Sequence, residues 1–191
     1  STVFRLTTAL GLATALGLSA GLACPLLFPA PLAAQHGLAP GGGPYDPVVP
    51  APRAVLGYEV GERFTPHHLL VRYLERLAAA SPRVRLDTVG HTYEGRELLL
   101  AIVTSPENHA RLDRIRADAR RLAGPRGASA AELAAAAARL PAIVWLGFTV
   151  HGGEASGTEA AIALLYQLAA GQDEETRLVL DSTVLLVDPL Q

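Results

Sequence analysis

Two residues that could bind a metal lie three positions apart in the segment VWLGFTVHGGEASGTEA, namely His151 and Glu154. Zinc accepts both imidazole nitrogen and carboxylate oxygen, and a catalytic zinc has three protein ligands and one open position for water. The pair could therefore supply two of the three ligands, with two intervening glycines allowing the backbone to bend. The spacing is equally compatible with a loop histidine and a glutamate that favours the N-terminus of the following helix by its charge.

The pattern His-x-x-Glu is too short to be specific, because a second match occurs at His91 and Glu94. That second pair falls in an expected hairpin turn, and we rank it well below His151 and Glu154. Other polar side chains are expected to have structural or solvent-exposed roles: His67 and His68 in the first turn of a helix, His109 in a charged helix, Arg96 in a salt bridge, and Glu159 facing solvent or capping a helix.

The composition excludes several classes of protein. The 191 residues are 50% hydrophobic and 18% charged, which is incompatible with a disordered charged tail. All basic residues are arginine, so a Schiff-base lysine, pyridoxal phosphate anchoring and a lysine-dependent phosphate loop are excluded within this chain. The net charge of −2 argues against a general nucleic-acid binder. The single cysteine, Cys24, cannot form an internal disulfide or a multi-cysteine site, so any metal must be held by histidine and carboxylates.

The N-terminal part of the sequence is typical of export. Residues 6–34 carry no charge and follow Arg5, which predicts a signal peptide over residues 1–34 and a secreted or periplasmic protein. A retained membrane anchor, or a lipid anchor on Cys24, is the weaker alternative. Residues 35–54 are rich in proline and glycine and predict an extended linker, with compact structure beginning near Val55.

Helix and strand patterns alternate through the remainder of the chain. Thr65 and Pro66 predict an N-cap and a first helical residue, and Ser129 with Glu132 predicts a capping box. The predicted helices are 65–77, 105–122, 129–140 and 157–170. The predicted strands are 84–88, 98–103, 142–148 and 183–187. The strands 98–103, 142–148 and 183–187 are expected to be buried. Alternating helices and strands, with an early hairpin turning at 93–96, predict an α/β fold with a mixed sheet flanked by helices.

Residues 142–162, AIVWLGFTVHGGEASGTEAAI, resemble the zinc-binding segment of the zinc carboxypeptidases related to carboxypeptidases A and B. The resemblance continues upstream through GHTYEGR at 90–96 and TSPEN at 104–108, and so covers about residues 55–191. It implies that His151 and Glu154 bind one zinc ion and that the substrates are peptide or protein C-termini. Gly153 stands where relatives often have asparagine, at a position that is not a ligand.

The resemblance also implies what lies beyond Gln191. The family's third zinc ligand, its carboxylate-binding arginines and its general-base glutamate all fall downstream. Residues 55–191 are therefore expected to be the N-terminal part of a catalytic domain, truncated at the C-terminus and inactive alone. No nucleic-acid partner is expected, and no membrane partner after signal cleavage.

Two other classes stay open from the residues alone. A strand followed by His-Gly-Gly also opens the oxyanion loop of serine esterases, although the required Gly-x-Ser-x-Gly occurs only at 17–21, within the predicted signal peptide. The second is a non-catalytic binding module of the same fold. A related deacylase acting on amino-acid derivatives is a further alternative at the level of substrate.

Overall fold

The computed structural model describes residues 43–190, so the predicted signal peptide and the first part of the predicted linker lie outside the described residues. In chain order the elements are α1 (Pro52–Leu56), α2 (His67–Ala80), β1 (Val84–His91), β2 (Glu97–Val103), α3 (Pro106–Ala110), α4 (Leu112–Ala123), α5 (Ala130–Arg139), β3 (Ala142–Gly147), α6 (Ala155–Ala170), α7 (Glu174–Ser182) and β4 (Thr183–Asp188). Within this part of the chain, none of the helices is long and apolar enough to cross a membrane.

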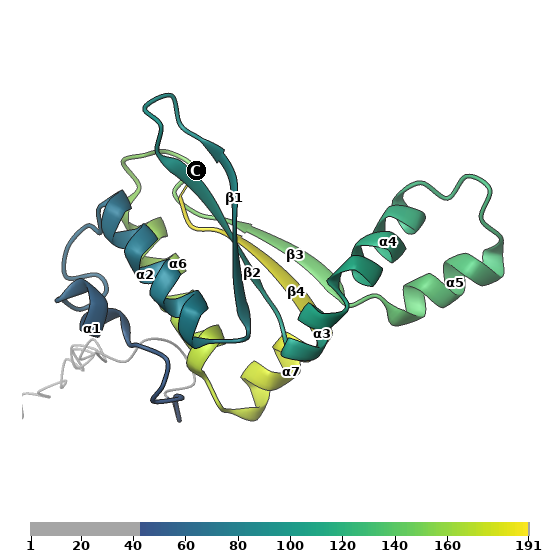
Figure 1. Ribbon diagram of the computed structural model, residues 1–191, viewed down its shortest axis with the longest axis horizontal. Coiled ribbons are helices and arrows are strands. Elements are labelled where there is room, and N and C mark those ends of the chain that lie inside the picture. Colours follow the sequence, from purple (N-terminus) through teal and green to yellow (C-terminus); the bar gives the residue numbers. More distant parts are fainter. Residues whose placement is uncertain (1–42, 191) are drawn as a thin grey trace, which may run out of the picture. The chain divides into compact units, whose positions relative to one another are not determined.

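The strands form one sheet in the order β1-β2-β4-β3 (Figure 1). β2 is antiparallel to both β1 and β4, whereas β3 is parallel to β4. The sheet is therefore mixed and flanked by helices, which confirms the predicted fold class. This topology places the carboxyl ends of β3 and β4 at the same end of the sheet as the β1–β2 turn.

The early hairpin explains an irregularity in the sequence pattern. Alternation of polar and apolar residues in β1 fails at Val89, and the pairing of β1 with β2 shifts register between Thr88 and Gly90. The extra residue of this β-bulge accounts for the exposed Val89 side chain. At the predicted turn Gly95 has a φ of 79°, a value that favours glycine.

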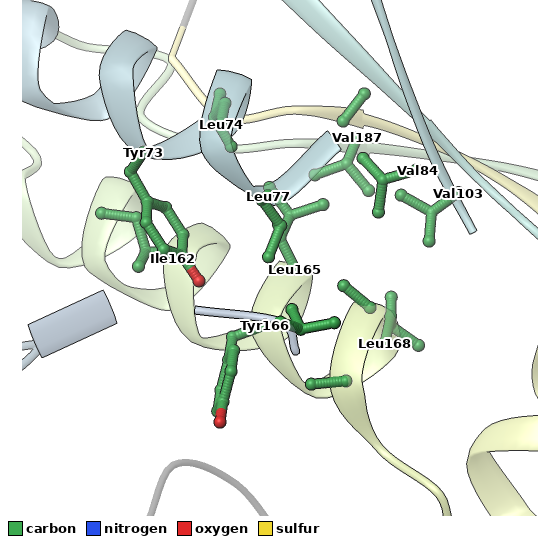
Figure 2. Packing of buried hydrophobic residues seen from close by; sticks show 14 of the residues in the cluster. Tyr73, Leu74, Leu77, Val84, Val103, Ile162, Leu165, Tyr166, Leu168 and Val187 are labelled. Atoms are coloured by element: carbon green, nitrogen blue, oxygen red, sulfur yellow. The ribbon is translucent and has the colours of Figure 1, made fainter. Parts of the chain in front are cut away.

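The main core lies between the sheet and the helices α2 and α6 (Figure 2). Leu74 and Leu77 of α2 and Leu165 of α6 are fully buried, as their helical spacing requires. Val103 and Val187 meet them from β2 and β4. Each such side chain contributes roughly 1.5–3 kcal/mol by leaving water. This packing fixes α6, which begins directly after the candidate metal loop.

The buried hydroxyl of Tyr73 in this core leads to a prediction. The Tyr73 hydroxyl is buried without a hydrogen-bond partner among the described residues, and burial raises its pKa. We expect Tyr73→Phe to increase the free energy of unfolding by about 1 kcal/mol, because it removes an unpaired buried hydroxyl.

Tyr58→Phe is the matched control for that substitution. The buried Tyr58 hydroxyl donates a hydrogen bond to Thr65 Oγ1 at 3.0 Å, so its removal should lower stability. Urea denaturation of both variants measures the difference. A Tyr73→Phe protein as destabilised as Tyr58→Phe would contradict the prediction.

Two predicted helix signals differ from the structure. Pro66, and not Thr65, is the N-cap of α2, because the Thr65 side chain is buried and accepts from Tyr58 instead of capping. The predicted helix 105–122 is two helices, α3 and α4, divided at Arg111. The Arg111 guanidinium donates back to Asn108 Oδ1 at 2.7 Å, and the buried Asn108 amide holds this corner against α7.

The predicted burial of β3 was wrong. Trp145 is 55% exposed and Ile143 is also exposed, because β3 is an edge strand of the sheet and pairs only with β4 among the described strands. An uninterrupted apolar run indicates a strand but does not tell an edge strand from a central one. The last strand, β4, is largely buried as predicted.

Compact structure begins earlier than Val55. Val49 and Pro52 are buried, and α1 starts within the predicted linker. Tyr45 donates a hydrogen bond to Gln167 of α6 at 2.7 Å. The described part of the linker, residues 43–54, is therefore packed against the domain and is not an extended tether, because its few apolar and aromatic residues find contacts that composition does not reveal.

The helices α4 and α5 pack mainly on each other and extend away from the sheet (Figure 1). The predicted capping box of Ser129 and Glu132 is present at the start of α5. Between the helices the Arg139 guanidinium donates to Asp118 at 2.9 Å, and this bond holds the pKa of Asp118 below its usual range. This helix pair is remote from the candidate site.

Candidate metal centre

The candidate site is the loop that joins β3 to α6, residues 148–154. It leaves the sheet at the carboxyl end of β3, beside the end of β4, and the Phe148 N–H donates to the Asp188 carbonyl at 2.9 Å. Open α/β sheets place their ligand sites just beyond the carboxyl ends of strands. The loop therefore has the location that a ligand site in this fold requires.

The side chains of His151 and Glu154 converge within this loop. His151 Nδ1 lies 2.7 Å from Glu154 Oε1, and the His151 backbone N–H donates to Glu154 Oε2 at 3.1 Å. The two side chains are 80% and 50% exposed, so a small ion can reach them. Ligand atoms lie about 2.0–2.2 Å from a zinc ion, so two donors of one ion are at most about 4 Å apart. The pair meets that limit.

The carboxylate of Glu154 is used within the loop and not to cap the helix. Glu154 is the N-cap of α6, but its side chain makes no capping hydrogen bond. Its hydrogen bonds with the His151 side chain and backbone N–H lower the pKa of Glu154. As the N-cap residue, Glu154 also places its negative charge at the N-terminus of α6, where such a charge is favourable.

The bend of the loop depends on residues that sequence reasoning missed. Neither Gly152 nor Gly153 has a positive φ; the residue that does is Thr149, with a φ of 50°. The buried Thr149 hydroxyl donates to the Glu154 carbonyl at 3.2 Å and lies 2.9 Å from the Thr158 hydroxyl. Gly157 of α6 packs against this residue so closely that a Cβ there would lie 2.6 Å from Thr149 Oγ1.

Glu159 ties a second loop to the first turns of α6. The predicted solvent-facing or capping role was wrong: the residue is 7% exposed, and its carboxylate accepts backbone N–H groups of Gly61 at 3.0 Å and Thr65 at 2.8 Å. The loop before α2 is therefore fixed beside the candidate site. Glu159 is the only charged residue within α6, and a single charge in an apolar helix is the signal that could have identified a buried, hydrogen-bonded group.

The second His-x-x-Glu match does not form a comparable pair. The Glu94 carboxylate forms an ion pair with Arg96 at 2.8 Å, which confirms the predicted salt bridge of Arg96. His67 Nε2 lies 2.8 Å from the Glu97 carbonyl oxygen. His109 is half-buried and its Nε2 lies 3.0 Å from the Arg83 carbonyl oxygen, so the prediction of a solvated His109 was wrong.

The chemistry of the donor set fits part of a zinc site. Among residues 43–190 there is no group of three or more histidine, cysteine or acidic side chains placed to hold a metal. His151 and Glu154 offer one nitrogen and one oxygen, which are the donor types of a catalytic zinc with three protein ligands. The described residues thus contain two converging donors of the required kind.

Comparison with family models identifies the family of this chain. The family model of the zinc carboxypeptidases matches residues 70–190, which is more than half of the chain. The chain belongs to the zinc carboxypeptidase family.

Among solved structures, the crystal structure of carboxypeptidase A from Helicoverpa armigera matches with 14% sequence identity and a TM-score of 0.47. The match covers 67% of this chain and 24% of that one, so the chain spans about a quarter of the length of that protein. No curated protein matches the sequence.

Proposed function

We propose that this chain contributes His151 and Glu154 as two zinc ligands of a metallocarboxypeptidase that hydrolyses C-terminal peptide bonds. The observation that supports the proposal is the 2.7 Å separation of the two donor atoms at the carboxyl end of β3, within a segment matched by the family model. A secreted or periplasmic location, predicted from residues 1–34, belongs to the same proposal.

The residues of this chain would hold the ion and keep it reachable. A bound zinc lowers the pKa of a coordinated water and polarises the scissile carbonyl. The exposure of both side chains leaves room for a peptide. The serine esterase alternative has no support in the family match.

The chain alone is proposed to bind zinc without turning over substrate. A catalytic zinc needs a third protein ligand, and the described residues offer no third group beside this pair. A general base that removes the proton of the water is likewise needed and is not assigned to any described residue. The alternative is a non-catalytic binding module that keeps the fold and binds no metal.

The test combines zinc binding with a peptidase assay on the 191-residue chain. Equilibrium dialysis should show one zinc per chain, lost in the double variant His151→Ala/Glu154→Ala. A blocked dipeptide with a free C-terminal carboxylate should not be hydrolysed. Hydrolysis abolished by Glu154→Ala would contradict the proposed incompleteness of the site, and absence of zinc binding would contradict its metal-binding role.

A further inference from the structure

We propose that Thr149 is a positioning residue of the metal site, whose hydroxyl holds the 148–154 loop in the shape that brings His151 and Glu154 together. The inference rests on the proposed zinc-binding function and extends it to a residue that is not itself a ligand.

The backbone at Thr149 adopts an unfavourable conformation. Its φ of 50° is the only positive value at a residue other than glycine among the described residues. β-Branched side chains are strained in this region. Such a residue persists only where its surroundings hold it in place, so the contacts of the Thr149 side chain matter.

Those contacts connect both ends of the candidate loop. The Thr149 hydroxyl donates to the carbonyl of Glu154, the second candidate ligand, at 3.2 Å. It can accept from the Thr158 hydroxyl, 2.9 Å away on the first turns of α6. Both threonines are buried, so neither hydrogen bond is readily replaced by water. The Thr149 side chain thus links the start of the loop to its end at Glu154 and to Thr158 of α6.

The helix is shaped to receive this residue. Gly157 lies against Thr149 with no room for a side chain, since a Cβ would be 2.7 Å from the Thr149 backbone nitrogen. The Gly157 N–H in turn donates to the Glu154 carbonyl at 3.0 Å. The same carbonyl therefore receives hydrogen bonds from Thr149 and from Gly157, which fixes the backbone of the candidate ligand.

Outer hydrogen-bond partners that orient metal ligands raise the affinity of the site. Here the orientation acts through the backbone of Glu154, because the Thr149 hydroxyl contacts its carbonyl and not its carboxylate. Loss of the hydroxyl should therefore weaken metal binding while leaving both donor groups in the chain.

A series of substitutions separates the hydroxyl from the strain. Thr149→Val keeps the shape and removes the hydroxyl, Thr149→Ser keeps the hydroxyl, and Thr149→Gly relieves the strain but has no hydroxyl. Thr104→Val is the matched control. Thr104 is fully buried, its hydroxyl lies 3.0 Å from the Leu180 carbonyl oxygen and 2.6 Å from that of Thr183, and the residue is at the opposite end of the sheet.

The readout is a Co²⁺ titration of each 191-residue variant, followed by visible absorption, with thermal unfolding measured in parallel. We expect the Val and Gly variants to bind Co²⁺ about tenfold more weakly, as for other outer-shell losses. The Ser variant and Thr104→Val should bind as the unaltered chain does, although Thr104→Val should unfold at a lower temperature.

Three results would overturn the inference. If Thr149→Val binds Co²⁺ as tightly as the unaltered chain, the Thr149 hydroxyl does not position the metal site. If Thr104→Val weakens Co²⁺ binding as much as Thr149→Val does, the loss of affinity reflects general destabilisation of the protein. If the unaltered chain binds no Co²⁺, both the proposed zinc site and this inference fail. If the unaltered chain binds Co²⁺ and Thr149→Val binds it equally well, only the inference about Thr149 fails.

Discussion

His151→Ala and Glu154→Gln should each weaken zinc binding by about a hundredfold or more, because a lost ligand costs more than the 10- to 100-fold typical of an outer-shell partner. The Gln variant retains the size of the side chain but replaces a charged oxygen donor with a neutral one. Both side chains are largely exposed, so the fold should be little affected. Isothermal titration with Zn²⁺ measures the affinity, and circular dichroism checks the fold.

The sequence supplies a matched control in its second His-x-x-Glu. His91 and Glu94 have the same residue types and spacing, but the Glu94 carboxylate is ion-paired with Arg96. His91→Ala and Glu94→Gln should therefore leave zinc affinity unchanged. Equal losses at both pairs would show that zinc binds nonspecifically to exposed histidines and carboxylates, which would contradict the assignment of the site.

Gly157→Ala should destabilise the protein by about 1–3 kcal/mol and also weaken metal binding, because the new methyl group overpacks a tight contact. The added Cβ would lie 2.6 Å from Thr149 Oγ1 and 2.7 Å from its backbone nitrogen. The obstacle is partly backbone, so it cannot move aside as a flexible side chain would. The loop must shift away from α6, carrying the candidate ligands with it. Guanidinium denaturation and a Zn²⁺ titration measure the two effects.

Gly153→Ala is the control for that prediction. A Cβ at Gly153 meets nothing within 4 Å, and its φ is not positive, so alanine should fit within about 0.5 kcal/mol. If both alanine variants were equally stable, the close contact between Gly157 and Thr149 would not exist in solution.

The parts of the fold that follow from local pattern were predictable. Amphipathic spacing identified α2, an apolar run identified β2, and paired cap residues identified the start of α5. These features depend on neighbours in sequence. The mixed sheet followed from one hairpin turn at Gly95 combined with alternating helices and strands.

The features that depend on distant neighbours were not predictable in the same way. The exposure of Trp145 depends on which strand ends the sheet, and the burial of Val49 depends on contacts with the rest of the domain. Glu159 was misjudged because its partners are backbone N–H groups almost a hundred residues upstream. Backbone groups carry no signal in the sequence.

The candidate site shows the same division. The spacing of His151 and Glu154 indicated two candidate donors, and the structure shows that their side chains converge. The glycines between them suggested where the chain bends, and the strained residue is instead Thr149. A threonine with positive φ has no sequence signature of its own. The nearest signal in the sequence is Gly157, and the need for glycine there becomes clear only from its close contact with Thr149 in the structure.

The most direct measurement is an NMR titration of the histidine side chains with Zn²⁺. As Zn²⁺ is added up to one equivalent, the chemical shifts of the His151 imidazole should change in proportion to the zinc added. Those of His67, His91 and His109 should not change. Equal shifts across several histidines, or a His151 signal indifferent to zinc, would contradict the claim that this loop holds the metal.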